Sequence, residues 1–94
     1  MNNLSLNYSP HTDIRCQQRG IKKEVINFIV NYGQCRNSHQ DKKYFINKKL
    51  LKKLSYKHEL FIKKFDKQIL RVGVIVNNNT VITAFQIDRN FLWN

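Results

Sequence analysis

Two β-branched segments near the C-terminus, residues 69–76 and 80–87, constrain the fold most strongly, and three consecutive asparagines separate them. Branched side chains fit a pleated sheet, and asparagine tolerates the left-handed backbone that tight turns require. The pattern therefore predicts an antiparallel β-hairpin over residues 69–87. Regular alternation would give each strand one shared face, formed by Leu70, Val72, Val74 and Val76 and by Val81, Thr83, Phe85 and Ile87.

Two helices are predicted in the N-terminal third of the chain. Ser9 followed by Pro10 is a favourable helix start, because serine can accept a backbone N–H at the N-cap and proline loses nothing at the first position. The first helix is expected over residues 10–18, and Gly20 ends it because glycine readily adopts positive φ. The second is expected over residues 22–32, with a buried stripe formed by Val25, Ile26 and Ile29.

The middle of the chain combines short strands with a lysine-rich helix. Residues 34–39 and 43–46 are predicted strands, and a polar turn at residues 40–42 separates them. Asn47 would cap a helix over residues 48–57, whose leucines face inward while its lysines face water.

The remaining segments complete a single domain. Residues 58–66 fit either a helix or a strand, and a helix is favoured because two phenylalanines lie four residues apart. Residues 1–8 are read as a loose leader or a short edge strand, and residues 88–94 as an apolar tail that docks on the core or on a partner. The whole chain, residues 1–94, is therefore predicted to be one α+β domain.

The charge of the chain points to an anionic partner. Its 94 residues include 17 Lys and Arg but only 6 Asp and Glu, for a formal net charge of +11. Such a field favours nucleic acid, an acidic protein or an anionic membrane surface. No long uncharged apolar run or signal-like start is present, so no membrane partner is expected and a cytoplasmic location is predicted. RNA, free or associated with the ribosome, is the preferred partner.

The sequence offers no metal site and no cofactor motif. Its carboxylates are scattered, and Cys16 and Cys35 lack the close spacing of zinc ligands, so both are predicted to be reduced thiols. Neither a metal nor a cofactor is expected, and a metal-dependent nuclease is disfavoured.

Three functional side chains share a regular spacing near the N-terminus. His11, Arg15 and Arg19 are four residues apart, which places the first two on one helix face and the third further along it. Arginine can hold phosphate bidentately, and histidine exchanges protons near neutral pH. The pattern favours phosphate binding beside a general acid or base. The alternative is a surface helix that carries a basic stripe within a basic chain.

Several short motifs occur in an ordered series. They are Ser-x-His-x-x-x-Arg-x-x-x-Arg-Gly-Ile at residues 9–21, Tyr-Gly at 32–33, a Tyr-Phe strand running into lysines at 44–49, and Val-Ile-Thr at 81–83. Together they resemble a family of small bacterial domains that is similar to the RelE/ParE-type toxins, within the barnase-, colicin- and RelE-like ribonuclease folds. The resemblance implies a helical hairpin packed on a curved antiparallel sheet. It also implies a toxin–antitoxin system, in which an antitoxin protein is the partner.

The resemblance further implies a set of site residues. The predicted catalytic residues are His11, Arg15, Tyr44 and Lys48. The residues predicted to contact RNA are Arg19, Lys49, Lys52, Thr83 and Arg89, of which Arg19 and Thr83 are carried over from the family's motifs. One departure bears on catalysis, because the family pattern has a His-Arg pair shortly after Val-Ile-Thr, whereas this chain has Gln86-Ile87. If that pair is catalytic in relatives, its absence weakens the enzyme interpretation.

The leading hypothesis is a metal-independent endoribonuclease. The 2′-hydroxyl of RNA would attack the adjacent phosphate, giving a cyclic phosphate and a free 5′-hydroxyl, with His11 as acid or base and nearby cations stabilising the transition state. The four predicted catalytic side chains are then expected to converge on one concave face. A non-catalytic module that binds RNA or an acidic protein is the alternative. A third hypothesis is an interaction protein that forms a homodimer through a sheet edge and the apolar tail.

Overall fold

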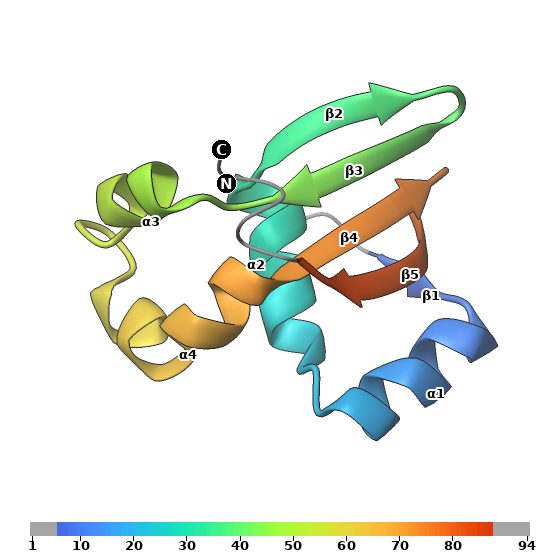
Figure 1. Cartoon of the computed structure of the whole chain (residues 1–94), viewed down its shortest axis with the longest axis horizontal. Helices are drawn as coiled ribbons and strands as arrows, with labels where there is room; N and C mark the ends of the chain where they lie inside the picture. The colour runs from blue at the N-terminus through green and yellow to red at the C-terminus, as the bar shows by residue number, and fades with distance from the viewer. Residues whose placement is uncertain (1–5, 88–94) are drawn as a thin grey trace.

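A computed structural model of the chain describes residues 6–87, apart from the side chain of Ser38, and shows an α+β fold (Figure 1). The predicted α+β class is confirmed. The predicted tail with Arg89, and most of the predicted leader, lie outside the described residues. In chain order the elements are β1 (Asn7–Tyr8), α1 (Pro10–Arg19), α2 (Lys23–Tyr32), β2 (Gln34–Ser38), β3 (Asp41–Phe45), α3 (Lys48–Leu54), α4 (Glu59–Arg71), β4 (Val72–Asn77) and β5 (Thr80–Gln86).

The five strands form one mixed sheet in the order β1-β5-β4-β3-β2. The pairs β2–β3, β3–β4 and β4–β5 are antiparallel, but β1 runs parallel to β5. The expectation of a purely antiparallel sheet is therefore corrected. Tight hairpins fix the direction of the β2–β3 and β4–β5 pairs, whereas β1 reaches β5 from the far end of the chain and no turn constrains its direction.

The asparagine turn between β4 and β5 has the left-handed backbone conformation that the sequence predicts. Asn78 and Asn79 have φ values of 49° and 62°, and they join β4 to β5 as a two-residue turn closed by the pair Asn77↔Thr80. The predicted C-terminal hairpin is confirmed in this respect. The first hairpin also turns over two residues, His39 and Gln40, so β3 begins two residues earlier than expected.

The ends of α1 follow from their capping residues. The Ser9 hydroxyl accepts a hydrogen bond from the backbone N–H of Thr12 at 3.1 Å. Gly20 ends the helix with a φ of 67°, and its N–H donates to the carbonyl of Cys16. The predicted start and stop signals of this helix are confirmed. Asn47 caps α3 as expected, by accepting from the N–H of Leu50, although α3 ends at residue 54 rather than 57.

A single buried threonine attaches α1 to the sheet. Thr12 is 0 % exposed, and its hydroxyl lies 2.9 Å from the carbonyl oxygen of Val81 and 2.8 Å from that of Ile82. The Ser9 hydroxyl is 2.8 Å away and completes the group. These bonds lay α1 along β5, starting at Val81, the last residue that pairs with β1 (Figure 1).

The same stretch of β5 contains a β-bulge that changes its face pattern. Val76 pairs with Val81 and Ile75 pairs with Thr83, so Ile82 is the extra residue. Val81 is therefore buried in the core, whereas Thr83 lies on the opposite face with Phe85. The prediction that Val81 and Thr83 share a face is wrong, because alternation within one strand assumes an unbroken register.

The core lies between the sheet and α2, which crosses one face behind β3 and β4 in Figure 1. The three residues of the predicted stripe, Val25, Ile26 and Ile29, are fully buried, so that prediction is confirmed. Val72, Val74 and Val76 of β4 meet them from the sheet.

Helix α4 continues further than the sequence suggests. It includes residues 69–71, which were expected to begin the strand, and β4 starts only at Val72. The predicted place of Leu70 on the face of Val72 is therefore wrong. An apolar stripe through Ile62 and Ile69, both buried, keeps the helical period to the end of α4 and outweighs the local β-propensity.

We predict that Thr12→Val destabilises the fold by about 1–3 kcal/mol, because valine keeps the shape but removes the hydroxyl that bonds the carbonyl groups of Val81 and Ile82. Thr83→Val is the matched control, and its effect should stay below about 0.5 kcal/mol on the partly exposed opposite face. Urea-induced unfolding measures both values. Equal losses in the two variants would contradict the anchoring role of Thr12.

Candidate nucleic-acid interface

The basic residues of α1 share one flank of the helix. Thr12 and Cys16 are buried against the sheet, so a rotation of about 100° per residue places His11, Arg15 and Arg19 together on one side. His11 and Arg19 are exposed and Arg15 is partly buried. The three side chains thus form a line about 12 Å long from the start of α1 to its end.

Asp13 occupies the opposite flank and forms an ion pair. Its carboxylate lies 2.6 Å from Nζ of Lys23, and this is the one ion pair within residues 6–87. The Lys23 ammonium also lies over the ring of Tyr8 at 4.8 Å from the centroid. The carboxylate is thereby engaged away from the flank that carries the basic residues.

At the end of α1 three cations gather around one hollow, which we call the basic cleft. It has a volume of about 240 Å³ and lies between the end of α1, the turn that follows it, the last turns of α4 and the sheet. Arg19, Lys67 and Arg71 are its cationic members, and no carboxylate lines it. Its remaining lining residues are Ile21, Gln68, Val72 and Gln86.

The side chain of Gln68 connects α4 to the turn between α1 and α2. Nε2 of Gln68 donates to the carbonyl of Gly20 at 3.0 Å, and its Oε1 accepts from the N–H of Lys22 at 3.1 Å. Both ends of the amide are therefore used to hold the backbone. This bridge brings Arg19, which precedes Gly20, next to the cations of α4.

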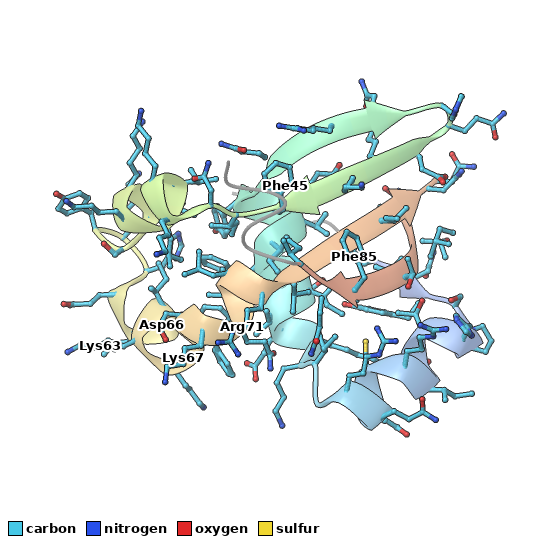
Figure 2. The ribbon with its side chains drawn as sticks, viewed as in Figure 1. Phe45, Lys63, Asp66, Lys67, Arg71 and Phe85 are labelled. Atoms are coloured by element: carbon cyan, nitrogen blue, oxygen red, sulfur yellow. The ribbon has the colours of Figure 1, made fainter. Side chains whose placement is uncertain are left out.

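The cleft continues as a basic stripe along α4. Lys63, Lys67 and Arg71 are four residues apart, and Figure 2 shows them following one another along the helix. Asp66 lies beside this stripe, and its Oδ1 accepts from the backbone N–H of Lys67 at 2.8 Å. It does not line the cleft.

The sheet face opposite α2 carries a second group of basic and aromatic side chains. Arg36 lies over the ring of Phe45 at 5.4 Å, and Lys43 lies over the ring of Phe85 at 5.6 Å. Figure 2 labels both rings on this face, which we call the outer sheet face. Phe85 leans over Gly73, its partner in β4, because a side chain at Gly73 would occupy the space of the ring.

The other predicted catalytic residues lie elsewhere. Tyr44 is partly buried opposite Cys35, and burial, followed by the Cys35 thiol, raises the pKa of its phenol. It lines a separate hollow of about 300 Å³ beside the asparagine turn. Lys48 begins α3, which lies at the other end of the molecule from α1 (Figure 1).

The structure therefore does not bring the four predicted catalytic side chains to one face, and the expected convergence is wrong. His11 and Arg15 belong to the α1 flank, while Tyr44 and Lys48 belong to the region where β3 leads into α3. Of the residues predicted to contact RNA, Arg19 lines the basic cleft and Thr83 lies on the outer sheet face. Lys49 and Lys52 are exposed on α3.

Sequence reasoning missed Lys67, Arg71 and Gln68. The sequence predicts a helix over residues 58–66, with a strand as the alternative, and a strand from residue 69, so Lys67 and Gln68 fall between the two elements and Arg71 falls in the strand. The signal was present, because Lys63, Lys67 and Arg71 repeat every four residues.

The buried thiol of Cys16 lines a different hollow from the basic cleft, and its surroundings make it a poor nucleophile. Burial raises the pKa of Cys16, and nearby Asp13 raises it further, against a smaller opposing effect of Lys23. The thiol therefore stays protonated near neutral pH, and a protonated thiol reacts poorly.

Among residues 6–87, no three His, Cys, Asp or Glu side chains gather in a way that could hold a metal ion. Within the same part of the chain no helix has the length and apolar content needed to cross a bilayer.

Comparison with protein-family models, curated proteins and solved structures finds no match to this chain. The resemblance to RelE/ParE-type toxins stays a prediction.

We predict that Gln68→Ala lowers the free energy of unfolding by about 1–2 kcal/mol, because it removes both hydrogen bonds to the turn after α1. Gln18→Ala, on the exposed side of α1, is the control and should change stability by less than about 0.5 kcal/mol. Urea-induced unfolding of both variants tests this. An unchanged Gln68→Ala protein would mean that the bridge does not hold the cleft together.

Proposed function

We propose that this chain binds RNA, chiefly through the phosphate groups of the strand. The observation that carries the proposal is the basic cleft, where cations from α1 and α4 line one hollow without a carboxylate. Arg19 and Arg71 offer planar donor pairs that fit phosphate oxygens, and Lys67 adds a mobile point charge. Residues so far apart in the sequence form a common anion site only in the folded chain.

The balance of charges supports the same conclusion. The chain has 17 basic and 6 acidic side chains, and the described residues form a single ion pair. Most of the positive charge is therefore not neutralised within residues 6–87. A polyanion that releases its counterions on binding would relieve this repulsion, which is how nucleic acids bind basic proteins.

The outer sheet face supports RNA as the polyanion. Lys43 lies there over the ring of Phe85, which is only partly buried, whereas the ring of Phe45 under Arg36 is 2 % exposed and is not available to a base. Basic side chains beside an aromatic ring on a sheet suit single strands, whose bases stack on rings while their phosphates meet cations.

Metal-independent RNA cleavage is a second candidate function, and the exposed position of His11 favours it. His11 shares the α1 flank with Arg15 and Arg19, so a phosphate held by the arginines would lie on the same side as the imidazole. In this version the reaction uses α1, and Tyr44 and Lys48 take no part. A cleaving protein of this kind would need a neutralising antitoxin as partner.

We predict that RNA affinity falls steeply with salt and that the basic cleft accounts for part of this slope. Lys67→Gln should weaken binding about fivefold and reduce the slope of log K against log salt by about 0.7, the value for one lost contact with a single strand. Lys57→Gln removes the same charge from the turn after α3 and is the matched control. Fluorescence titrations over a range of salt concentrations measure both quantities. A flat salt response, or equal losses in the two variants, would contradict the proposal.

For the second candidate, we predict that His11→Ala abolishes RNA cleavage and changes RNA affinity by less than about twofold, because one imidazole among many cations adds little to phosphate-driven binding. His39→Ala makes the same change in an exposed turn and should retain activity. A gel assay of labelled RNA in the presence of a chelator measures cleavage. Absence of cleavage by the unaltered protein would leave RNA binding as its function.

A further inference from the structure

We propose that the basic cleft selects a phosphomonoester, namely the terminal phosphate of an RNA strand, over the phosphodiesters within the strand. The inference rests on the proposed function in one respect, since it takes RNA as the molecule that carries the phosphate. It goes further by assigning the cleft a ligand group and by making one end of the strand the point of recognition.

The form of the cleft favours a chain end. Its volume is about 240 Å³, and the buried side chains of Ile21 and Val72 belong to its lining. Arg19 approaches from α1, while Lys67 and Arg71 approach from α4. A phosphodiester brings two chain connections into this space, whereas a terminal phosphate brings one and leaves its other oxygens for the cations.

The charge of the cleft favours a dianion. Three cations share one small hollow with no carboxylate in its lining, so they repel one another. A phosphomonoester carries a charge of about −1.5 to −2 at neutral pH, while a phosphodiester carries about −1. The monoester therefore cancels more of the repulsion within the cleft.

The donors of the cleft also match three phosphate oxygens. Arg19, Lys67 and Arg71 each present several N–H donors, and Gln86 adds an exposed amide at the rim. Gln68 is already engaged by the turn after α1, through its Oε1 and one N–H of Nε2, so we assign it no contact with the ligand. A terminal phosphate has one more free oxygen than a phosphodiester and so engages one more donor.

The first test compares three RNA oligonucleotides of one sequence, with both ends unphosphorylated, with a 5′-phosphate or with a 3′-phosphate. At about 0.15 M salt we expect one phosphorylated form to bind about tenfold more tightly than the unphosphorylated strand. Arg71→Gln should remove this preference, and Lys57→Gln should keep it. Equal affinity of the unaltered protein for all three strands overturns the inference while RNA binding itself stands.

The preference should also depend on pH, because the second ionisation of a phosphomonoester has a pKa of about 6. Between about pH 7.5 and about pH 5.5 the terminal phosphate loses most of its second charge, and we expect the preference to shrink toward equality. Arg19, Lys67 and Arg71 line the cleft, and side chains of these types stay charged over this range. A preference that is unchanged at the lower pH contradicts recognition of a dianion.

A third measurement separates this inference from the proposed function. Inorganic phosphate, compared with chloride at equal ionic strength, should raise the midpoint of thermal unfolding, because a ligand that binds the native state stabilises it. The shift should vanish in Arg71→Gln and persist in Lys57→Gln. If phosphate and a 5′-mononucleotide bind in this way but RNA does not, the proposed function fails and the specificity of the cleft stands. If neither produces a shift, the inference is overturned.

Discussion

The attachment of Thr12 to β5 is the contact on which the surface of this protein depends. The two-residue strand β1 pairs with β5 only as far as Val81, and the edge of β5 continues past it from the bulge at Ile82. A buried carbonyl without a donor is costly, and an open strand edge invites unwanted pairing. The Thr12 hydroxyl lies within hydrogen-bond distance of the carbonyls of Val81 and Ile82, to which it donates its one hydrogen, and α1 covers the edge. Because Thr12 must face β5, this contact also fixes how α1 is turned about its own axis. The basic residues of α1 therefore point in a defined direction.

The basic cleft follows from this rotation together with one bridge. With Thr12 and Cys16 turned to the sheet, the C-terminal end of α1 carries Arg19 toward α4. Gln68 then ties the following turn to α4 through two hydrogen bonds. The cations of the cleft are not paired with carboxylates, so their mutual repulsion opposes this closure. The structure therefore uses neutral hydrogen bonds to hold charged groups near one another, and this leaves the charges free for a ligand.

Local features of the fold could be predicted from the sequence, whereas long-range features could not. The cap of α1, the asparagine turn and the buried stripe of α2 depend on neighbouring residues or on a short period, and each was predicted correctly. The parallel pairing of β1 depends on contacts across the whole chain, and the bulge at Ile82 depends on how two strands fit together. For the site, the sequence pointed to Arg19 and the other basic residues of α1 as phosphate ligands, but not to Lys67 and Arg71. These two were missed because the predicted helix ended before Ile69, whereas α4 continues to Arg71. The convergence of Tyr44 and Lys48 with His11 failed for a related reason, since spacing along a chain does not reveal which side of a sheet a segment reaches.

The contact between Phe85 and Gly73 restricts how the two central strands can pair. A slip by one residue would turn the buried valines of β4 toward the opposite face, so the apolar pattern already forbids it. A slip by two residues preserves the faces, and hydrophobicity alone does not exclude it. In that register the ring of Phe85 would face Ile75 or the end of α4, where no gap receives it. Gly73 has no side chain, and the ring of Phe85 fills the space that a Cβ would occupy there. This contact therefore favours one register of the hairpin over registers shifted by two residues.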